Sequence, residues 1–278
     1  MGLRINTNVT SLMAQRSLSQ VTDKQNQSLG RLSSGTRINR AADDAAGLAI
    51  SEKLKAGIRG INQANRNAND GISLIQTSEG GLNEISSILV RLRELAVQSA
   101  SDTVGDAERS LTDIEYQSLK SEVDRISQVT EFNGKKLLNG TGDFYDFQIG
   151  INNVPSEDRI SYDAQITNSS LDSLGLVGLS VSSKTSSQES LSLLDQAIQA
   201  ISGKRANLGA IQNRLVNTSN NLQGMSENLS AANSRIRDTD FALETAENTR
   251  LNILTQAGTS VLAQANNQGA AALKLLNG

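Results

Sequence analysis

The longest periodic pattern of apolar residues begins at Leu54 and ends at Ala96. Stepping alternately by four and three residues along this stretch meets thirteen positions, of which nine are apolar. Such spacing places apolar side chains on one stripe of a helix, so the pattern predicts a helix with a heptad-like seam. The 43 residues would measure roughly 65 Å, twice the diameter of a small domain. We therefore expect this helix to be part of a rod.

A second seam runs through residues 191–236, where nine of fourteen heptad positions are apolar. Because the two seams match in length, side-by-side packing of their helices is expected. A shorter helix is predicted for residues 106–129, with Gly105 as a break and Asp106 as its N-cap. Together the three stretches predict a long helical bundle, and hence a mainly α fold.

The segment between these helices has a different pattern. Residues 145–149 and 160–166 alternate apolar and polar side chains, and a turn region with the only proline, Pro155, separates them. This alternation predicts a β-hairpin within about residues 140–180. Residues 180–190 are rich in serine, which predicts a solvated loop.

Both ends of the chain carry narrow apolar stripes flanked by Asn, Gln, Ser and Thr. Each would be a marginal helix in water by itself. They are expected to form a coiled coil, either with each other or with copies of themselves. The N-terminal stripe begins with Ile5, Val9 and Leu12, and the C-terminal stripe includes Leu251, Leu254, Gly258, Val261, Ala265, Gln268, Ala272 and Leu275.

Five glycines fall inside the first long helix, and each weakens a helix by about 1 kcal/mol relative to alanine. Packing against other parts of the structure must therefore supply much of the stability of this helix. Glycines that face a neighbouring element also let the two backbones approach closely, whereas the alternative is that they are tolerated on the surface. The glycines are Gly57, Gly60, Gly71, Gly80 and Gly81.

The amino-acid composition of the chain mainly serves to exclude classes of function. The chain has no Cys and no His, so thiol chemistry, disulfides and the commonest general base and metal ligand are absent. We therefore expect no enzyme activity, metal or cofactor. A net charge of −3 gives no reason to expect nucleic acid or a membrane as partner. No stretch approaches the 18 apolar residues of a membrane span or forms a cleavable secretion signal.

Two charged motifs need no special function. Adjacent residues on a helix point about 100° apart, so the pair Asp43-Asp44 does not converge as a catalytic dyad would. Two acids at the start of a helix instead favour capping and dipole stabilisation. The charges around Arg91 fit a solvated helix face, and the glycines of residues 134–142 lack the context of a nucleotide-binding loop.

Longer motifs at both ends resemble those of bacterial flagellin. They occur in the family's order and cover roughly residues 1–140 and 185–278. The matching segments are Ile5–Asn8, Arg31–Asn39, Ala42–Gly47, Arg66–Ser73, Arg93–Gln98, Phe132–Gly134, Ser234–Asp238 and Gln256–Asn266.

The resemblance implies a structural subunit that is exported through the flagellar type III channel and polymerises into the motility filament outside the cell. Residues 1–40 and 237–278 would form an inner coiled-coil domain, and residues 41–236 an outer rod with the hairpin. Because only about residues 140–190 separate the two helical regions, a minimal flagellin without large outer domains is expected.

The same resemblance implies partners. The chain itself is the first, followed by an export chaperone at the C-terminal segment and by the hook–filament junction and filament cap proteins. Flagellins recognised by Toll-like receptor 5 use positions that correspond here to Arg91, Leu95 and Glu115. The chain departs from the family at Val90, where recognised members often carry Gln.

Three other classes are alternatives. A hook–filament junction protein shares the export route and the terminal coiled coil, but the unbroken match at residues 256–266 favours flagellin. A cytoplasmic signalling coiled coil would keep one continuous seam and would not need the aromatic β segment. An enzyme would have to work without His or Cys.

Overall fold

The computed structural model describes residues 7–142 and 144–276, and the side chains of residues 268–276 lie outside that description. The described chain is mainly helical, which confirms the predicted fold class. Its helices are α1 (Val9–Ser34), α2 (Ala45–Ser99), α3 (Asp106–Val129), α4 (Pro155–Asp158), α5 (Lys184–Arg237) and α6 (Phe241–Leu276). Its strands are β1 (Glu131–Phe132), β2 (Lys135–Lys136), β3 (Phe144–Gln148) and β4 (Arg159–Asp163).

The chain divides into two compact units. The terminal unit comprises Met1–Ala56 with Asn228–Gly278, and the central unit comprises Gly57–Glu227. Helices α2 and α5 contribute residues to both units. The domain boundaries at residues 40 and 237, which the family resemblance implies, stay a prediction. They rest on position in a filament, whereas the two units here are defined by compactness.

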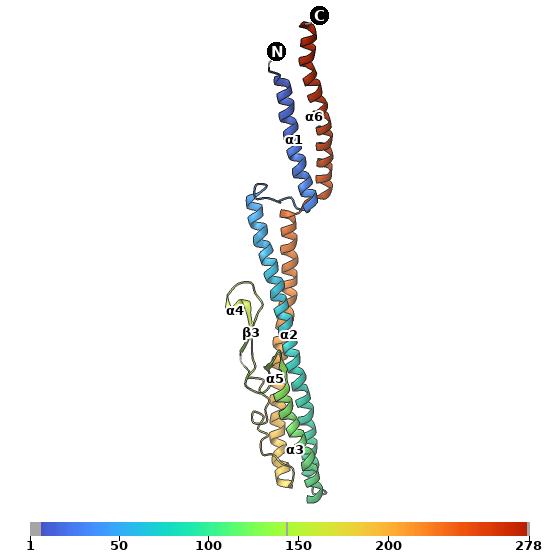
Figure 1. Ribbon diagram of the computed structural model, residues 1–278. Helices are drawn as coiled ribbons and strands as arrows, with labels where there is room; N and C mark the ends of the chain where they lie inside the picture. Colours follow the sequence, from blue (N-terminus) through green and yellow to red (C-terminus); the bar gives the residue numbers. More distant parts are fainter. Residues whose placement is uncertain (1–6, 143, 277–278) are drawn as a thin grey trace. The chain divides into compact units, whose positions relative to one another are not determined.

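The central unit is a bundle of α2, α3 and α5 (Figure 1). The seams predicted for residues 54–96 and 191–236 fall in the observed helices α2 and α5, and α3 has the predicted bounds. The bundle buries a continuous apolar core, and ion pairs join its helices at the surface. Arg93 on α2 lies 2.6 Å from Asp195 on α5. Core residues from the three helices include Ile75, Leu82, Leu89, Tyr116, Val123, Leu194, Ile201 and Leu208.

The acidic pair at residues 43–44 acts as the sequence predicts. Asp44 accepts a hydrogen bond of 2.8 Å from the Gly47 amide in the first turn of α2, which satisfies one of the helix's free N–H groups. Asp43 accepts from the backbone amides of Arg40 and Asn39, and these bonds lower the pKa of its carboxyl. At α3 the prediction is one residue off, because the N-cap is Gly105 and Asp106 is the first helical residue.

The predicted hairpin is formed by β3 and β4, which pair antiparallel with Tyr145 opposite Tyr162. The two rings stack with centroids 5.9 Å apart. The turn between the strands contains the short helix α4, which begins at Pro155. The pairing of β1 with β2 was not predicted, since strands of two residues carry no periodic signal.

The prediction of a solvated loop over residues 180–190 is wrong. Helix α5 already begins at Lys184, and Val181, Ser187 and Ser190 are buried. The serines tolerate burial because their hydroxyls donate to backbone oxygens four residues earlier, Ser187 to Ser183 and Ser190 to Ser186, both at 2.8 Å. A serine-rich segment can therefore start a buried helix.

Three of the glycines in α2 face a neighbouring element, which confirms that interpretation for them. A Cβ atom at Gly60 would lie 2.9 Å from Ile151, one at Gly71 would lie 3.1 Å from the Phe147 ring, and one at Gly81 would lie 2.7 Å from Leu138. Gly80 has nothing within 4 Å and fits the alternative of a tolerated surface glycine. The close approaches let the hairpin and its flanking segments lie against α2.

Candidate interaction surfaces

Helices α1 and α6 lie side by side in the terminal unit (Figure 1). Their least exposed positions follow heptad spacing on both helices, as in a coiled coil. We call these positions the inner seam. On α1 the inner seam comprises Ser11, Ala14, Leu18, Val21, Gln25, Ser28 and Leu32, and on α6 it comprises Glu244, Asn248, Leu251, Thr255, Gly258, Leu262 and Ala265.

Side-chain hydrogen bonds and an ion pair join the two helices along the inner seam. Asn8 caps α1 by accepting from the Ser11 amide, and its side-chain amide donates to the Ala265 carbonyl at 2.8 Å. Farther along, the Gln25 side-chain amide donates to Asn252 at 2.5 Å. At the other end, Arg31 lies 3.8 Å from the buried carboxylate of Glu244. The seam thus contains polar groups at positions that apolar residues fill in a stable coiled coil.

Backbone hydrogen bonds also join the segment that follows α1 to the segment that precedes α6. Helix α1 ends at Gly35, which adopts a left-handed φ of +68°, a conformation that glycine takes without steric cost. The Gly35 carbonyl accepts from the Thr239 amide at 3.0 Å, and the Arg37 amide donates to the Arg237 carbonyl at 2.6 Å. The turns after α1 and before α6 are thereby joined.

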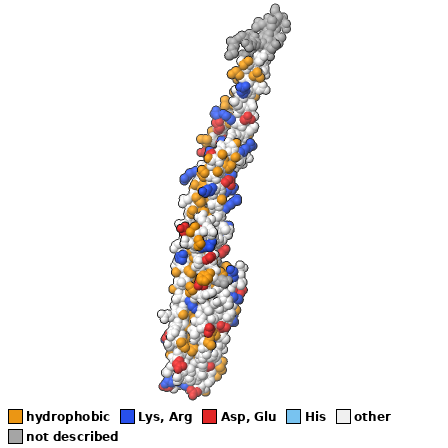
Figure 2. Space-filling model, turned by 90° about the vertical axis from the view of Figure 1, so that its left-hand side faces the viewer, with side chains coloured by type: hydrophobic (Ala, Val, Ile, Leu, Met, Phe, Trp, Pro, Cys, Tyr) orange, Lys and Arg blue, Asp and Glu red, His pale blue; other side chains and the backbone are white. Residues whose placement is uncertain are grey.

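The terminal unit exposes more large apolar side chains than it buries. Within residues 7–56 and 228–267, the buried apolar side chains are Ile38, Leu251 and Ala265. The exposed large ones, which we call the outer set, are Val9, Leu12, Met13, Leu29, Ile50, Phe241, Leu243, Ile253, Leu254 and Val261. Figure 2 likewise shows hydrophobic side chains exposed among charged ones on the face it draws. Exposed apolar surface of this kind is typical of a protein–protein interface.

The predicted coiled-coil residues divide between these two surfaces. Leu251 and Ala265 lie in the inner seam, whereas Val9, Leu12, Leu254 and Val261 belong to the outer set. Ile5 lies outside the described residues, as does the side chain of Leu275. The pairing of α1 with α6 therefore uses a seam that shares Leu251 and Ala265 with the predicted stripes and leaves the other four residues exposed. Sequence reasoning missed the remaining members of the outer set apart from Leu29, namely Met13, Ile50, Phe241, Leu243 and Ile253.

A second candidate surface joins α2 and α3 in the central unit. The guanidinium of Arg91 lies 3.0 Å from Glu94 and 2.9 Å from Glu115. Hydrogen bonds to these two carboxylates raise the pKa of Arg91 above its ordinary value, and the bond to Glu94 has the larger effect. The structure thus brings together two of the three residues expected to contact a receptor. The third, Leu95, is 2 % exposed and belongs to the core.

The described residues contain no cluster of three or more acidic side chains placed to hold a metal ion. In the same part of the chain, no helix combines the length and apolar character needed to cross a membrane. The positive features define a class: a mainly helical protein whose terminal helices α1 and α6 pair and whose surface exposes apolar side chains of the kind that mediate assembly.

Comparison with known proteins identifies the family. The model of the bacterial flagellin N-terminal helical region matches residues 5–143, and that of the C-terminal helical region matches residues 191–276. A flagellin of Halalkalibacterium halodurans is 47% identical over 98% of this chain and 99% of its own length. The flagellar filament 30.7 kDa core protein of Treponema maltophilum is 42% identical over 98% of this chain and 99% of its own length.

A solved structure agrees with these matches. The crystal structure of Bacillus cereus flagellin is 32% identical to this chain, with a TM-score of 0.51 over 60% of this chain and 94% of that one. The chain belongs to the bacterial flagellin family and is a structural subunit of the filament. Whole-length matches to flagellins favour this family over a junction protein, and the short interval between the two matched regions fits a minimal flagellin.

Proposed function

We propose that this chain is exported through the flagellar type III channel and polymerises outside the cell through its paired terminal helices. The observation that carries the proposal is the imbalance in the terminal unit, where three apolar side chains are buried and ten large ones are exposed among the described residues. Each helix would be marginal alone. Contacts between subunits would bury the outer set and offset the entropy lost when the ends become ordered.

The weak inner seam also suits export. A chain that threads a narrow channel must lose its tertiary structure, and this one has no disulfide to break because it has no Cys. The polar inner seam of α1 and α6 gives little cohesion before assembly. By resemblance to the family, we propose that residues 1–40 and 237–278 form the inner domain of the filament and residues 41–236 the outer one.

Further partners follow from the family. We propose an export chaperone that binds the C-terminal segment, contacts with the junction and cap proteins at the two ends of the filament, and recognition by Toll-like receptor 5. The half-exposed pair of Arg91 and Glu115 supports a receptor contact. Leu95 would contribute indirectly, because its buried side chain helps to hold α2 in the bundle.

Deletion of residues 237–278 tests the polymerisation proposal. The shortened chain loses α6 and with it the C-terminal half of the outer set. We expect it to remain helical in the central unit, as measured by circular dichroism, and to form no filaments on sheared seeds in electron micrographs. Filaments of normal length from the shortened chain would refute the proposal.

A further inference from the structure

Methionine is rare in this chain, and one of its methionines belongs to the outer set. The chain has three, of which the structure describes Met13 and Met225. Met13 is 65% exposed, more than any other member of the outer set on α1. Val9 lies four residues before Met13 and three before Leu12, so the three side chains share one side of the helix. The Met13 thioether is therefore part of the apolar surface that the proposed contacts between subunits would cover.

A thioether is also the group that a peroxide oxidises in a chain without thiols. The chain has no Cys, so its methionines hold all of its sulfur. In the reaction a lone pair on the sulfur attacks one oxygen of hydrogen peroxide, and an S–O bond forms as the O–O bond breaks. The departing hydroxide takes the proton of the transferred oxygen and becomes water. The sulfur is oxidised by two electrons, and the product is methionine sulfoxide.

Oxidation of Met13 would act on the contact between copies and not on the pairing of α1 with α6. A sulfoxide is polar, and burying it among apolar side chains without a hydrogen-bond partner costs free energy. Met13 is exposed and is not part of the inner seam, whose nearest members are Ser11 and Ala14. A sulfoxide at Met13 should therefore leave the fold of the free subunit intact and weaken its contacts with other copies.

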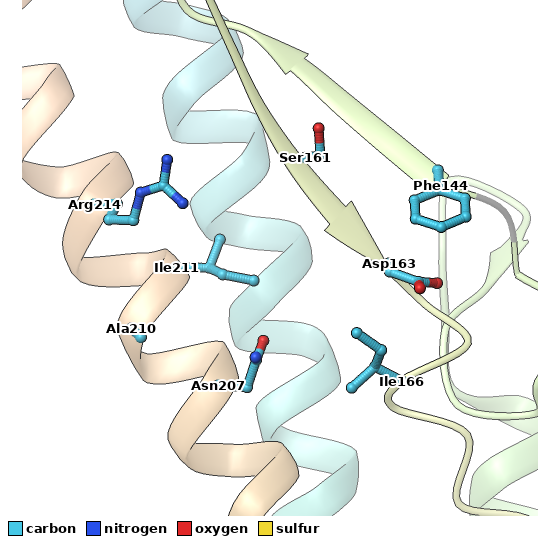
Figure 3. A pocket seen from close by; sticks show the side chains of 8 residues that line it. All are labelled: Phe144, Ser161, Asp163, Ile166, Asn207, Ala210, Ile211 and Arg214. Atoms are coloured by element: carbon cyan, nitrogen blue, oxygen red, sulfur yellow. The ribbon is translucent and has the colours of Figure 1, made fainter. Parts of the chain in front are cut away.

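A second exposed apolar surface, in the central unit, offers no such target. A groove of about 400 Å³ lies between the β3–β4 hairpin and α5 (Figure 3). Its apolar lining comes from Phe144 and Ile166 on the hairpin side and from Ala210 and Ile211 on α5, and no methionine is among the described residues that line it. Met225 is 43% exposed on α5 and does not belong to the outer set. It therefore serves as an internal control for oxidation elsewhere in the chain.

We propose that Met13 is an oxidation site through which peroxides control the assembly of the free subunit. The inference rests on the proposed function, in which the outer set forms the contacts between copies. Oxidation of Met13 weakens these contacts before assembly, whereas in the filament neighbouring copies cover the thioether and protect it. The change is reversible, because methionine sulfoxide reductases A and B each reduce one epimer of the sulfoxide.

Peroxide treatment of free subunits tests the proposal, with Met13→Leu as the variant and Met225→Leu as its matched control. Hydrogen peroxide is added and then removed with catalase, and peptide mass spectrometry measures the sulfoxide at each methionine. The treatment should raise the critical concentration for seeded growth of the unaltered chain and of M225L about tenfold or more, equivalent to about 1.4 kcal/mol per subunit, and both reductases together should reverse this rise. The critical concentration of M13L should change little. An equal rise in M13L and the unaltered chain, or a sulfoxide at Met13 without effect on growth, would overturn the proposal.

A second measurement tests the protection of Met13 without any substitution. Filaments and free subunits of the unaltered chain are treated with hydrogen peroxide side by side, and the sulfoxide at Met13 is followed over time by mass spectrometry. Oxidation of Met13 should be at least about tenfold slower in the filament, because a covered thioether reacts only when its contact opens. Equal rates would overturn the proposal. That outcome is distinguishable from failure of the proposed function, since deletion of residues 237–278 tests polymerisation without any oxidant.

Discussion

The Arg91 guanidinium on α2 lies 2.9 Å from the Glu115 carboxylate on α3, with both side chains about half exposed. This pair links two helices at a surface that outside partners can reach. Leu95 lies one helical turn beyond Arg91 and is 2 % exposed. The three residues expected to contact the receptor therefore differ in role, and substitutions at them should separate recognition from folding.

Arg91→Ala should lower activation of Toll-like receptor 5 in reporter cells, because it removes the cation that a receptor would contact. Its effect on folding should be small, since exposed ion pairs contribute about 0 to 1 kcal/mol. Arg93→Ala is the matched control, because Arg93 is also exposed on α2 and pairs with Asp195 on another helix. An R91A protein that signals as strongly as the unaltered chain would refute the receptor contact.

Leu95→Ala should act through stability. Removal of a buried leucine side chain costs about 2 to 5 kcal/mol, so the thermal midpoint of L95A should fall well below that of R91A, as measured by circular dichroism. Any loss of Toll-like receptor 5 activation by L95A should accompany this fall in the thermal midpoint. A thermal midpoint equal to that of the unaltered chain would show that Leu95 contributes little to the core.

The adjacent glycines of α2 should respond to alanine in opposite ways. Gly80 has open space around it, so Gly80→Ala should stabilise the helix by about 1 kcal/mol. At Gly81 the new Cβ would lie 2.7 Å from the Leu138 side chain, which is fully buried, and 2.8 Å from the Thr130 hydroxyl, so the surrounding packing would have to shift. The clash should make G81A about 1 to 3 kcal/mol less stable than G80A. Urea unfolding measures the difference, and equal stabilities would contradict the close packing at Gly81.

Tyr116 should make the protein sensitive to alkali. Burial raises the pKa of Tyr116 from 10.0 to about 12. Between these two pH values the folded state keeps the phenolic proton, whereas the unfolded state loses it. The resulting stability is fully present below pH 10 and is lost as pH rises through about 12. Tyr116→Phe removes the ionisation and should reduce this loss by roughly 2 kcal/mol. Equal losses in both proteins, measured by urea unfolding below and above this range, would show that Tyr116 does not titrate as argued.

Much of the fold could be predicted because its helices repeat one pattern over many turns. The heptad spacing from Leu54 onward is sustained long enough to exclude a strand, and the alternation around Tyr145 and Tyr162 is equally regular. The start of α5 was not predictable from composition, because serines whose hydroxyls bond to the backbone four residues earlier can be buried. The amino-acid composition does not show which serines form these hydrogen bonds.

The surfaces were only partly predictable. Apolar spacing identifies Val9, Leu12, Leu254 and Val261 but does not say what they face. In the structure, α1 and α6 pair through a seam one residue away from Leu254 and Val261, with Thr255 and Leu262 at these positions. Polar residues and glycine alternate in that seam with apolar residues such as Leu18, Val21 and Leu262, so hydrophobicity identified only part of it. The groove beside Phe144 depends on how the hairpin lies against α5, which no local pattern specifies.

The central claim is that the outer set of the terminal unit drives polymerisation, and one comparison tests it most directly. Leu254→Glu/Val261→Glu places two charges on the exposed apolar side of α6, and Gln256→Glu/Ala263→Glu places two charges on another exposed face of the same helix. Growth on sheared seeds, followed by light scattering and electron microscopy, should be abolished or slowed at least about tenfold in the first variant and much less affected in the second. Growth of L254E/V261E at the rate of the unaltered chain would contradict the account.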